Sequence, residues 1–444
     1  MVNKLFVQPL LFASPVYWPD RAELDAAGKA VAGMLEAMDA PTSLMRTARI
    51  VAGDADLDDA LSSLGRAVPL LVPLSGGVQK RMLAAAGAAS ESLLWSFFPN
   101  DDIYPEGERP TITRIVSKNA LPAVADVWGT LRNRGCRVAK VYHEGSWLAA
   151  ARELKAAHRV RSARLLLVGY TQEWVVSASV DTRKMERLLG ISSVHIGLEE
   201  LFAEFETCRN DSVSASLAKK FADGARSCLE PNMEQIEQAF RMYRALKNLL
   251  ARYGCNALAI SCFSLAKTLG VTACVALSML NDEPETVAAC EGDLDAAVSM
   301  IVGKAITGMP VFMGNPVYNL ENTLDIVHCT APRKLLSANA QPYEIRSHHE
   351  TGLSVSQRVE VEGERDATIF RIGNEFRNAV LFEAPLLSNP RLDTCRTQFR
   401  FGLKSWEACF DAMLGCHHMV AFGRHGDALE RFMKQRLGLE VVRF

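Results

Sequence analysis

The sequence of 444 residues predicts an α/β protein with two Rossmann-like, doubly wound parallel-sheet domains and a C-terminal, mostly antiparallel, barrel-like β domain. Three observations predict this class. The chain is too long for one hydrophobic core, and short apolar runs alternate with helical patterns up to about residue 310. Beyond that point apolar and polar residues alternate with a period of two, which is typical of antiparallel strands. We expect domains at residues 1–160, 161–310 and 311–444.

The first expected domain alternates strands with helices. Its apolar start is interrupted by Gln8 and Pro9, which favours a first buried strand over a signal peptide. Strands then follow at 67–75, 91–99 and 136–143, and helices at 21–38, 77–87 and 121–135. Strand–helix alternation at this spacing predicts βαβ units around a parallel sheet.

The second expected domain repeats this alternation. We expect strands at 163–170, 192–198 and 255–263, and helices at 182–190, 214–229 and 232–254. The long apolar run 258–280 contains Lys267 and Gly270, so a buried strand, a turn and a second buried element fit it better than a membrane span.

The third expected domain contains the alternating segments. Strands are expected at 322–330, 352–363, 365–373 and 377–385, with Gly, Asn or Pro between them.

Composition excludes several classes of protein. The net charge is −2 and no Lys/Arg-rich run is present, so neither nucleic acid nor an anionic membrane is expected as a partner. Cysteine occurs eleven times, an odd number without a C-x-x-C pair, which favours reduced, mostly buried thiols over a disulfide framework or a structural zinc site. We therefore expect a cytoplasmic protein.

The glycine pair in PLSGGVQKR, residues 73–81, invites comparison with a phosphate-binding loop. The chain lacks the pattern G-x-x-x-x-G-K-[ST], so nucleotide hydrolysis is poorly supported. A tight strand-to-helix turn explains the pair better, although a substrate-facing role at the carboxyl end of a strand stays open.

Histidine is concentrated near the C-terminus. Six of the nine histidines lie between residues 328 and 425, namely His328, His348, His349, His417, His418 and His425. Neighbouring residues of a strand point to opposite faces, so each adjacent pair can turn one imidazole inward. A single histidine is more often a surface or hydrogen-bonded core residue, but six within one β domain favour a shared role for some of them.

Two acids stand in the segment ACEGDLDAAVSM. Mn²⁺ and Mg²⁺ need carboxylates, and imidazole is accepted by the softer of such metals. Glu291 and Asp293, together with His328 and one histidine of the 417–418 pair, are therefore candidate ligands of a mixed metal site. For Asp293 the alternative is capping of the helix that begins at LDAAVSM, because an acid there meets free N–H groups.

Four segments, CEGDLDAAVSM, PVFMGN, VHCTAP and CHHMVAFG, resemble ordered landmarks of the L-fucose/L-arabinose isomerase family. In the N-terminal half, VPLSGGVQKRMLAAAG, LLWSF, SKNALPAV and LVGYTQEWVVSASVD resemble outlying members. The resemblance implies two Rossmann-like domains and a β-barrel, a homo-oligomer such as a trimer or hexamer, and interconversion of aldoses and ketoses. It also implies bound Mn²⁺, with Mg²⁺ or Co²⁺ as the other candidates.

The same resemblance implies roles for individual residues. Glu291 matches the metal-ligating glutamate that also acts in proton transfer, with Asp293 as a second catalytic candidate or a cap. His328 matches a histidine ligand. The last histidine ligand matches the pair His417 and His418, of which we favour His418.

One departure from the family concerns its second acid, which falls within an F-M-acid motif. This chain reads FMGN, so Gly314 or Asn315 stands where a carboxylate is expected, and Asp293 or Glu350 are candidates to replace it. An Asn carbonyl can ligate a hard cation but carries no charge. We expect Asn315 to be a neutral ligand or a sugar contact. Further candidates for sugar contacts are Trp95, Lys118, Trp174 and His349, for which ordinary packing or solvation is the alternative.

These residues predict a metal-dependent isomerase that acts through a cis-enediol(ate) on a pentose, a 6-deoxyhexose or a related sugar. Two alternatives follow from the missing carboxylate. One is an enzyme of the same fold with different chemistry on a sugar-like or sugar-acid metabolite. The other is a non-catalytic sugar-binding or regulatory protein.

Overall fold

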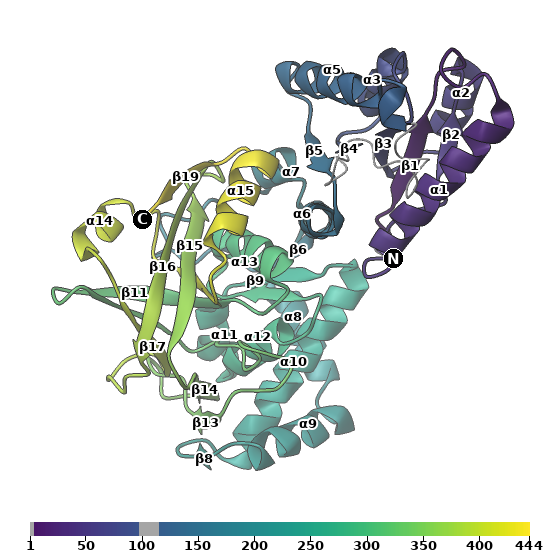
Figure 1. The fold of residues 1–444 in the computed structure, drawn as a ribbon. Coiled ribbons are helices and arrows are strands. Elements are labelled where there is room, and N and C mark those ends of the chain that lie inside the picture. Colours follow the sequence, from purple (N-terminus) through teal and green to yellow (C-terminus); the bar gives the residue numbers. More distant parts are fainter. Residues whose placement is uncertain (1–3, 97–114) are drawn as a thin grey trace. The chain divides into compact units, whose positions relative to one another are not determined.

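The computed structural model describes residues 4–96 and 115–444. The chain divides into two compact units, residues 1–155 and 156–444, and most of their elements are labelled in Figure 1. The partition into three domains stays a prediction. Residues 97–99 of the strand expected at 91–99 lie outside the described residues.

The first unit contains a five-stranded parallel sheet in the order β2-β1-β3-β4-β5, as the strand–helix alternation predicted. Its strands are β1 (Val7–Phe12), β2 (Arg49–Val51), β3 (Val68–Pro73), β4 (Ser92–Trp95) and β5 (Val138–Val141). Its helices are α1 (Arg21–Asp39), α2 (Asp54–Ser62), α3 (Gln79–Gly87), α5 (Ala120–Asn133) and α6 (Glu144–Arg161), the last of which continues into the second unit. Leu11 and Leu10 of β1 belong to two different apolar clusters, because successive side chains point to opposite faces that are both covered.

The second unit begins with a four-stranded parallel sheet in the order β10-β9-β6-β7. Its strands are β6 (Arg164–Val168), β7 (Ser192–Ile196), β9 (Ala257–Ile260) and β10 (Val287–Ala289). The strand order runs outward from β6 in both directions. The loops that follow β6 and β9 therefore separate at a topological switch point, where open α/β sheets bind their ligands.

Seven helices belong to this part of the chain: α7 (Thr182–Leu189), α8 (Leu198–Thr207), α9 (Ser212–Asp223), α10 (Met233–Tyr253), α11 (Cys262–Leu269), α12 (Cys274–Asn281) and α13 (Leu294–Thr307). The apolar run 258–280 forms the end of β9, α11 and most of α12, as expected. The helix expected at 214–229 is wrong beyond Asp223. It stops at Gly224, and Ser227–Cys228 form β8, which pairs with a distant strand of the chain.

The rest of the second unit forms a closed barrel. The strand order is β15-β18-β11-β12-β17-β16, and antiparallel pairing of β15 with β16 closes the ring. These strands are β11 (Phe312–Asn319), β12 (Thr323–His328), β15 (Arg365–Gly373), β16 (Asn378–Ser388), β17 (Thr397–Gly402) and β18 (His418–Phe422), and β19 (Glu440–Arg443) pairs in parallel with β16. A small separate sheet joins β8 (Ser227–Cys228), β13 (Tyr343–Arg346) and β14 (Ser356–Val359), and the helices here are α14 (Trp406–Asp411) and α15 (Gly426–Arg436). The predicted antiparallel, barrel-like architecture is confirmed.

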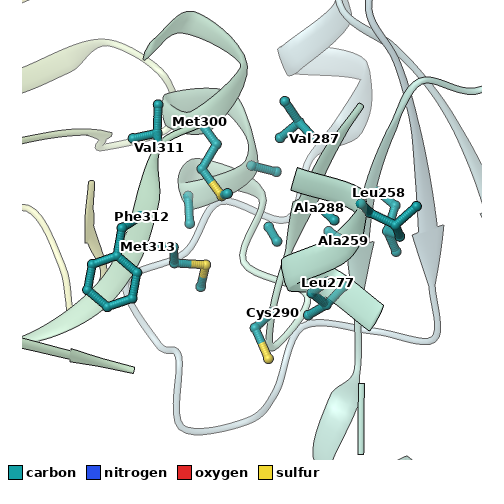
Figure 2. Packing of buried hydrophobic residues seen from close by; sticks show 14 of the residues in the cluster. Leu258, Ala259, Leu277, Val287, Ala288, Cys290, Met300, Val311, Phe312 and Met313 are labelled. Carbon is teal, nitrogen blue, oxygen red and sulfur yellow. The ribbon is translucent and has the colours of Figure 1, made fainter. Parts of the chain in front are cut away.

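Helix α13 connects the parallel sheet to the barrel. It packs against β9 and β10 and also against β15 and β18. One apolar cluster therefore runs through both sheets. Figure 2 shows part of it, with Val287 of β10, Met300 of α13 and Phe312 of β11 in the same packed region. Any side chain at the start of α13 is consequently held firmly beside the barrel.

Two further findings bear on the class of protein. Within residues 4–96 and 115–444, the helices are too short or too polar to span a bilayer. Eight of the eleven cysteines are buried, whereas Cys416 is partly exposed and Cys136 and Cys228 are exposed, which agrees with the expectation of mostly buried thiols.

Candidate metal centre

Glu291 lies in a tight turn between β10 and α13. Its backbone is left-handed, with φ of 57°, and Gly292 follows with φ of 64°. A Cβ on Gly292 would lie 2.4 Å from the carbonyl oxygen of Tyr170, so only glycine fits. The Gly292 N–H donates to the Ile260 carbonyl, and the Gln172 N–H donates to the Glu291 carbonyl. The loop after β6 and the last residue of β9 thus hold a backbone conformation that is unfavourable for glutamate, a kind of strain that clusters at functional sites.

The barrel brings two imidazoles to this carboxylate. His328 ends β12 and His417 directly precedes β18, and both strands pair with β11. Nε2 of His417 lies 3.6 Å and Nε2 of His328 lies 3.9 Å from Oε1 of Glu291. These separations exceed ordinary hydrogen bonds. They are close to the spacing of two ligands that each lie about 2.1 Å from one ion.

Asp293 orients the ring of His417. Its Oδ2 lies 2.8 Å from Nδ1 of His417 and accepts a 3.1 Å hydrogen bond from the Arg371 guanidinium. Within the described residues, the buried Nε2 of His417 has no hydrogen-bond partner. A carboxylate that fixes one ring nitrogen while the other is left bare is the usual support of a metal-ligating histidine. The donor set therefore fits a divalent cation.

His328 has a comparable but weaker support. Its Nδ1 lies 2.9 Å from the Thr330 hydroxyl. In the tautomer that carries its proton on Nδ1, the hydroxyl accepts from Nδ1–H and Nε2 has a free lone pair for a metal. The Thr330 backbone N–H also approaches Nδ1, at 3.3 Å, and this contact favours the other tautomer. Binding of a metal at Nε2 would select the first tautomer.

Trp174 holds the second oxygen of Glu291. Its indole N–H donates to Oε2 at 2.7 Å, and its ring packs edge-on against Phe263 with centroids 5.0 Å apart. Glu291 therefore has one oxygen tied to a half-exposed indole and the other facing the two imidazoles. Trp174 was expected to contact a sugar. The structure adds that it positions the carboxylate.

Charges reinforce this arrangement. Burial opposes ionisation of Glu291, but the nearby His328 and His417 outweigh it and hold the pKa of the carboxyl well below its usual range. Burial likewise opposes ionisation of Asp293, and the Arg371 charge and His417 reverse it, so the pKa of Asp293 is also lowered. Burial disfavours a charged His417, yet Asp293 raises its pKa well above the usual value. The centre thus presents two ionised carboxylates and one imidazole that a metal would deprotonate.

The structure separates the two histidines of the adjacent pair. His417 faces Glu291, whereas His418 is fully buried, and burial lowers its pKa to about 3. Neighbouring positions of an extended strand point to opposite faces, so only one imidazole of this pair reaches Glu291. We therefore carry His417 forward, in place of the favoured His418.

Of the other residues considered from the sequence, some line the same pocket as Glu291 and others do not. Asn315 lines a pocket together with Glu291 and His328. His348 and Glu350 also line this pocket, whereas His349 lies beside Asp393 with 3.9 Å between Nδ1 and Oδ1.

Two expected residues belong to the first unit. Trp95 is buried in β4, and the Lys118 ammonium lies over the Trp18 ring, 4.1 Å from its centroid. Within this unit they have packing and cation–π roles.

Asp293 caps α13, as one of the two interpretations of the sequence predicted, because its carboxylate accepts from the Ala296 N–H. The fully buried side chain also contacts Nδ1 of His417. Its role as a second catalytic acid stays a prediction. Sequence reasoning missed Arg371, although a charged residue between Phe370 and Ile372 in an apolar strand is a signal for a buried ion pair.

The fold and these side chains define an α/β protein with a closed barrel and a buried carboxylate–imidazole group that could hold a metal ion. No family model matches the sequence. The chain is similar to a curated protein named sulfoquinovose isomerase from Clostridium sp. (strain MSTE9), at 24% identity over 277 residues, which cover 58% of this chain and 61% of the relative. A second protein of that name, from Alkalicoccus urumqiensis, is 23% identical over 248 residues, or 54% of this chain and 55% of the relative. The chain thus matches less than two thirds of the length of either relative.

Proposed function

We propose that this protein is a metal-dependent aldose–ketose isomerase, with a sulfonated aldohexose such as sulfoquinovose as the first candidate substrate. The observation that carries the proposal is the convergence of Glu291, His328 and His417, which come from three separate elements and lie within 4.8 Å of one another. The similarity to two sulfoquinovose isomerases supports the reaction and the substrate. Pentoses and 6-deoxyhexoses remain substrate candidates.

Glu291, His328 and His417 would hold the ion, with Asn315 as a neutral ligand or a contact to a sugar hydroxyl. When bound, Mn²⁺, or Mg²⁺ or Co²⁺ in its place, would supply positive charge next to a sugar carbonyl and the enediolate derived from it.

The protein side chains would move the proton. Isomerisation takes the proton from C2 of the open-chain aldose, leaves a cis-enediolate, and returns a proton to C1, while the hydroxyl proton passes from O2 to O1. Glu291 is ionised at neutral pH and can accept the C2 proton. Trp174 donates to Oε2 of Glu291 while Oε1 faces the two imidazoles, so the orientation of the carboxylate is fixed. Asp293 and Arg371 hold His417 in a single orientation.

A second candidate function rests on Asn315. A neutral amide at this position leaves the pocket with one carboxylate fewer than the resemblance implies. An enzyme with this fold would then act on a sugar acid by chemistry other than isomerisation, or would bind a sugar without turnover.

Proton exchange with solvent distinguishes these functions. The full chain is loaded with Mn²⁺ and incubated in D₂O with sulfoquinovose, pentoses, 6-deoxyhexoses and sugar acids, and NMR follows deuterium at C1 and C2. We expect deuterium to enter one of the sugars and the ketose signals to appear. Glu291→Gln should abolish exchange, whereas Glu407→Gln on α14, an exposed glutamate, should not change it. Exchange that survives Glu291→Gln would refute the assigned base. Metal binding without exchange in any sugar would favour the second candidate function.

A further inference from the structure

A second group of metal-ligating side chains lines the same pocket. Cys329, Cys395 and Glu350 have ligand atoms within 4.8 Å of one another, and His348 lies outside this group but contacts Glu350. Sγ of Cys395 lies 3.2 Å from Oε1 of Glu350, and Nε2 of His348 lies 3.0 Å from its Oε2. None of these four residues has a role in the proposed isomerisation.

Three distant segments build the group. Cys329 directly follows β12, and Cys395 lies two residues before β17. These strands are antiparallel neighbours with His328 opposite Thr397, so both thiols lie at the same end of the ladder. His348 and Glu350 belong to the turn after β13, which is closed by a hydrogen bond from the Gly352 N–H to the His348 carbonyl.

The side chains have the orientation that ligation requires. The Thr351 hydroxyl lies 3.0 Å from Nδ1 of His348, which directs Nε2 toward Glu350. Both thiols are buried beside Cys274 and Val327, whereas the Glu350 side chain is 41% exposed and leaves one side open to solvent. An ion could therefore reach the group from that side.

The chemistry of this set differs from that of the Glu291 centre. Two sulfurs, one imidazole and one carboxylate are the ligands of tetrahedral Zn²⁺, and soft thiolates select against Mg²⁺ and Mn²⁺. Zinc–ligand bonds of about 2.0–2.3 Å place neighbouring ligand atoms about 3.3–3.8 Å apart. The contacts of 3.0 and 3.2 Å at Glu350 are near this range.

We propose that Cys329, Cys395 and Glu350 form a second metal site that binds Zn²⁺ or another thiophilic divalent ion, with His348, the neighbour of Glu350, as its fourth ligand. The ion joins the ends of β12 and β17 to the turn after β13 beside the pocket. Because this site shares no ligand with the Glu291 centre, metal binding here can be measured separately from the proposed isomerase activity.

Cobalt substitution tests the site, since only thiolates give a sulfur-to-cobalt charge-transfer band in the near ultraviolet. The full chain carrying Glu291→Gln, which removes the only carboxylate from the first centre's ligand set, is reduced, stripped of metal by a chelator and titrated with Co²⁺. We expect one equivalent of Co²⁺ to produce the band and one equivalent of Zn²⁺ to abolish it. The measurement needs neither substrate nor activity, so its outcome is separate from that of the isomerase test.

Matched variants decide the ligand assignment. Adding Cys395→Ser should roughly halve the band and weaken Co²⁺ binding at least about 10-fold, whereas Cys409→Ser, at a buried thiol on α14, should change neither. Far-ultraviolet circular dichroism checks folding. If Cys395→Ser does not fold, Glu350→Gln replaces it, and this variant should keep the band but bind Co²⁺ about 10-fold more weakly. Absence of the band in the reduced protein, or a band that Cys395→Ser leaves intact, would overturn the proposal.

Discussion

Replacement of Asp293 by asparagine tests how His417 is held for the metal. The substitution keeps the shape of the side chain but removes its charge. Asp293 uses Oδ1 to accept from the Ala296 N–H and Oδ2 to contact His417, whereas asparagine has only one oxygen. Loss of such a supporting carboxylate weakens metal binding about 10–100-fold. This range corresponds to about 1.4–2.7 kcal/mol of binding free energy. Calorimetric titration with Mn²⁺ measures the change.

The same substitution also affects stability. Arg371 is fully buried and would keep only Asp295, at 3.8 Å, as an ionic partner. Breaking a buried ion pair costs about 3–5 kcal/mol, and the remaining acid favours the lower end of that range. Urea unfolding followed by circular dichroism should therefore show a loss of about 3 kcal/mol.

Asp295→Asn is the matched control, because Asp295 shares Arg371 and helix α13 with Asp293 but does not touch His417. Burial raises the pKa of Asp295 to about 6, so the fold does not favour its ionised form. Loss of this charge in Asp295→Asn should therefore leave both the Mn²⁺ affinity and the free energy of unfolding at pH 7 nearly unchanged. Wild-type Mn²⁺ affinity in Asp293→Asn would refute the support of His417 by Asp293. An equal loss in both variants would assign the effect to Arg371 instead.

Three further predictions concern the same region. Gly292→Ala should destabilise the protein by about 1–3 kcal/mol and weaken Mn²⁺ binding, because its Cβ would lie 2.4 Å from a carbonyl oxygen. The control Gly308→Ala also has a positive φ but open space around it, so it should leave the Mn²⁺ affinity unchanged in the same titration. The free energy of unfolding of the wild type in urea, compared with that of Asp295→Asn, should fall by about 3 kcal/mol as the pH rises from about 4 to about 6 and should then level off. The reason is that the folded protein holds the Asp295 proton to higher pH than the unfolded chain does, and a difference that does not change with pH would contradict the raised pKa of Asp295. Trp174→Phe keeps the ring packing but removes the donor to Glu291, so kcat should fall about 10-fold with little change in KM, and an unchanged kcat would remove Trp174 from the positioning of the carboxylate.

Much of the candidate centre could be found from residue types in order. His328 lies in a strand that the sequence indicates, and Glu291 and Asp293 directly precede an indicated helix, for which Asp293 has the signature of a cap. The choice between His417 and His418 could not be made in this way. A shift of one position reverses the face of a strand, and the pairing of Gly314 with His418 that sets the register involves residues about a hundred positions apart.

The sequence by itself determined the types and order of the elements, the parallel and antiparallel halves of the chain and the acids and histidines worth considering, because helix and strand periods are local properties. Only the tertiary structure decided which side chains meet. The pairing of β15 with β16 closes the barrel, Asp293 reaches His417 across 124 positions, and Cys329, Cys395 and Glu350 gather from three loops. Such contacts depend on strand register and on packing between distant segments, which no local pattern of residues records.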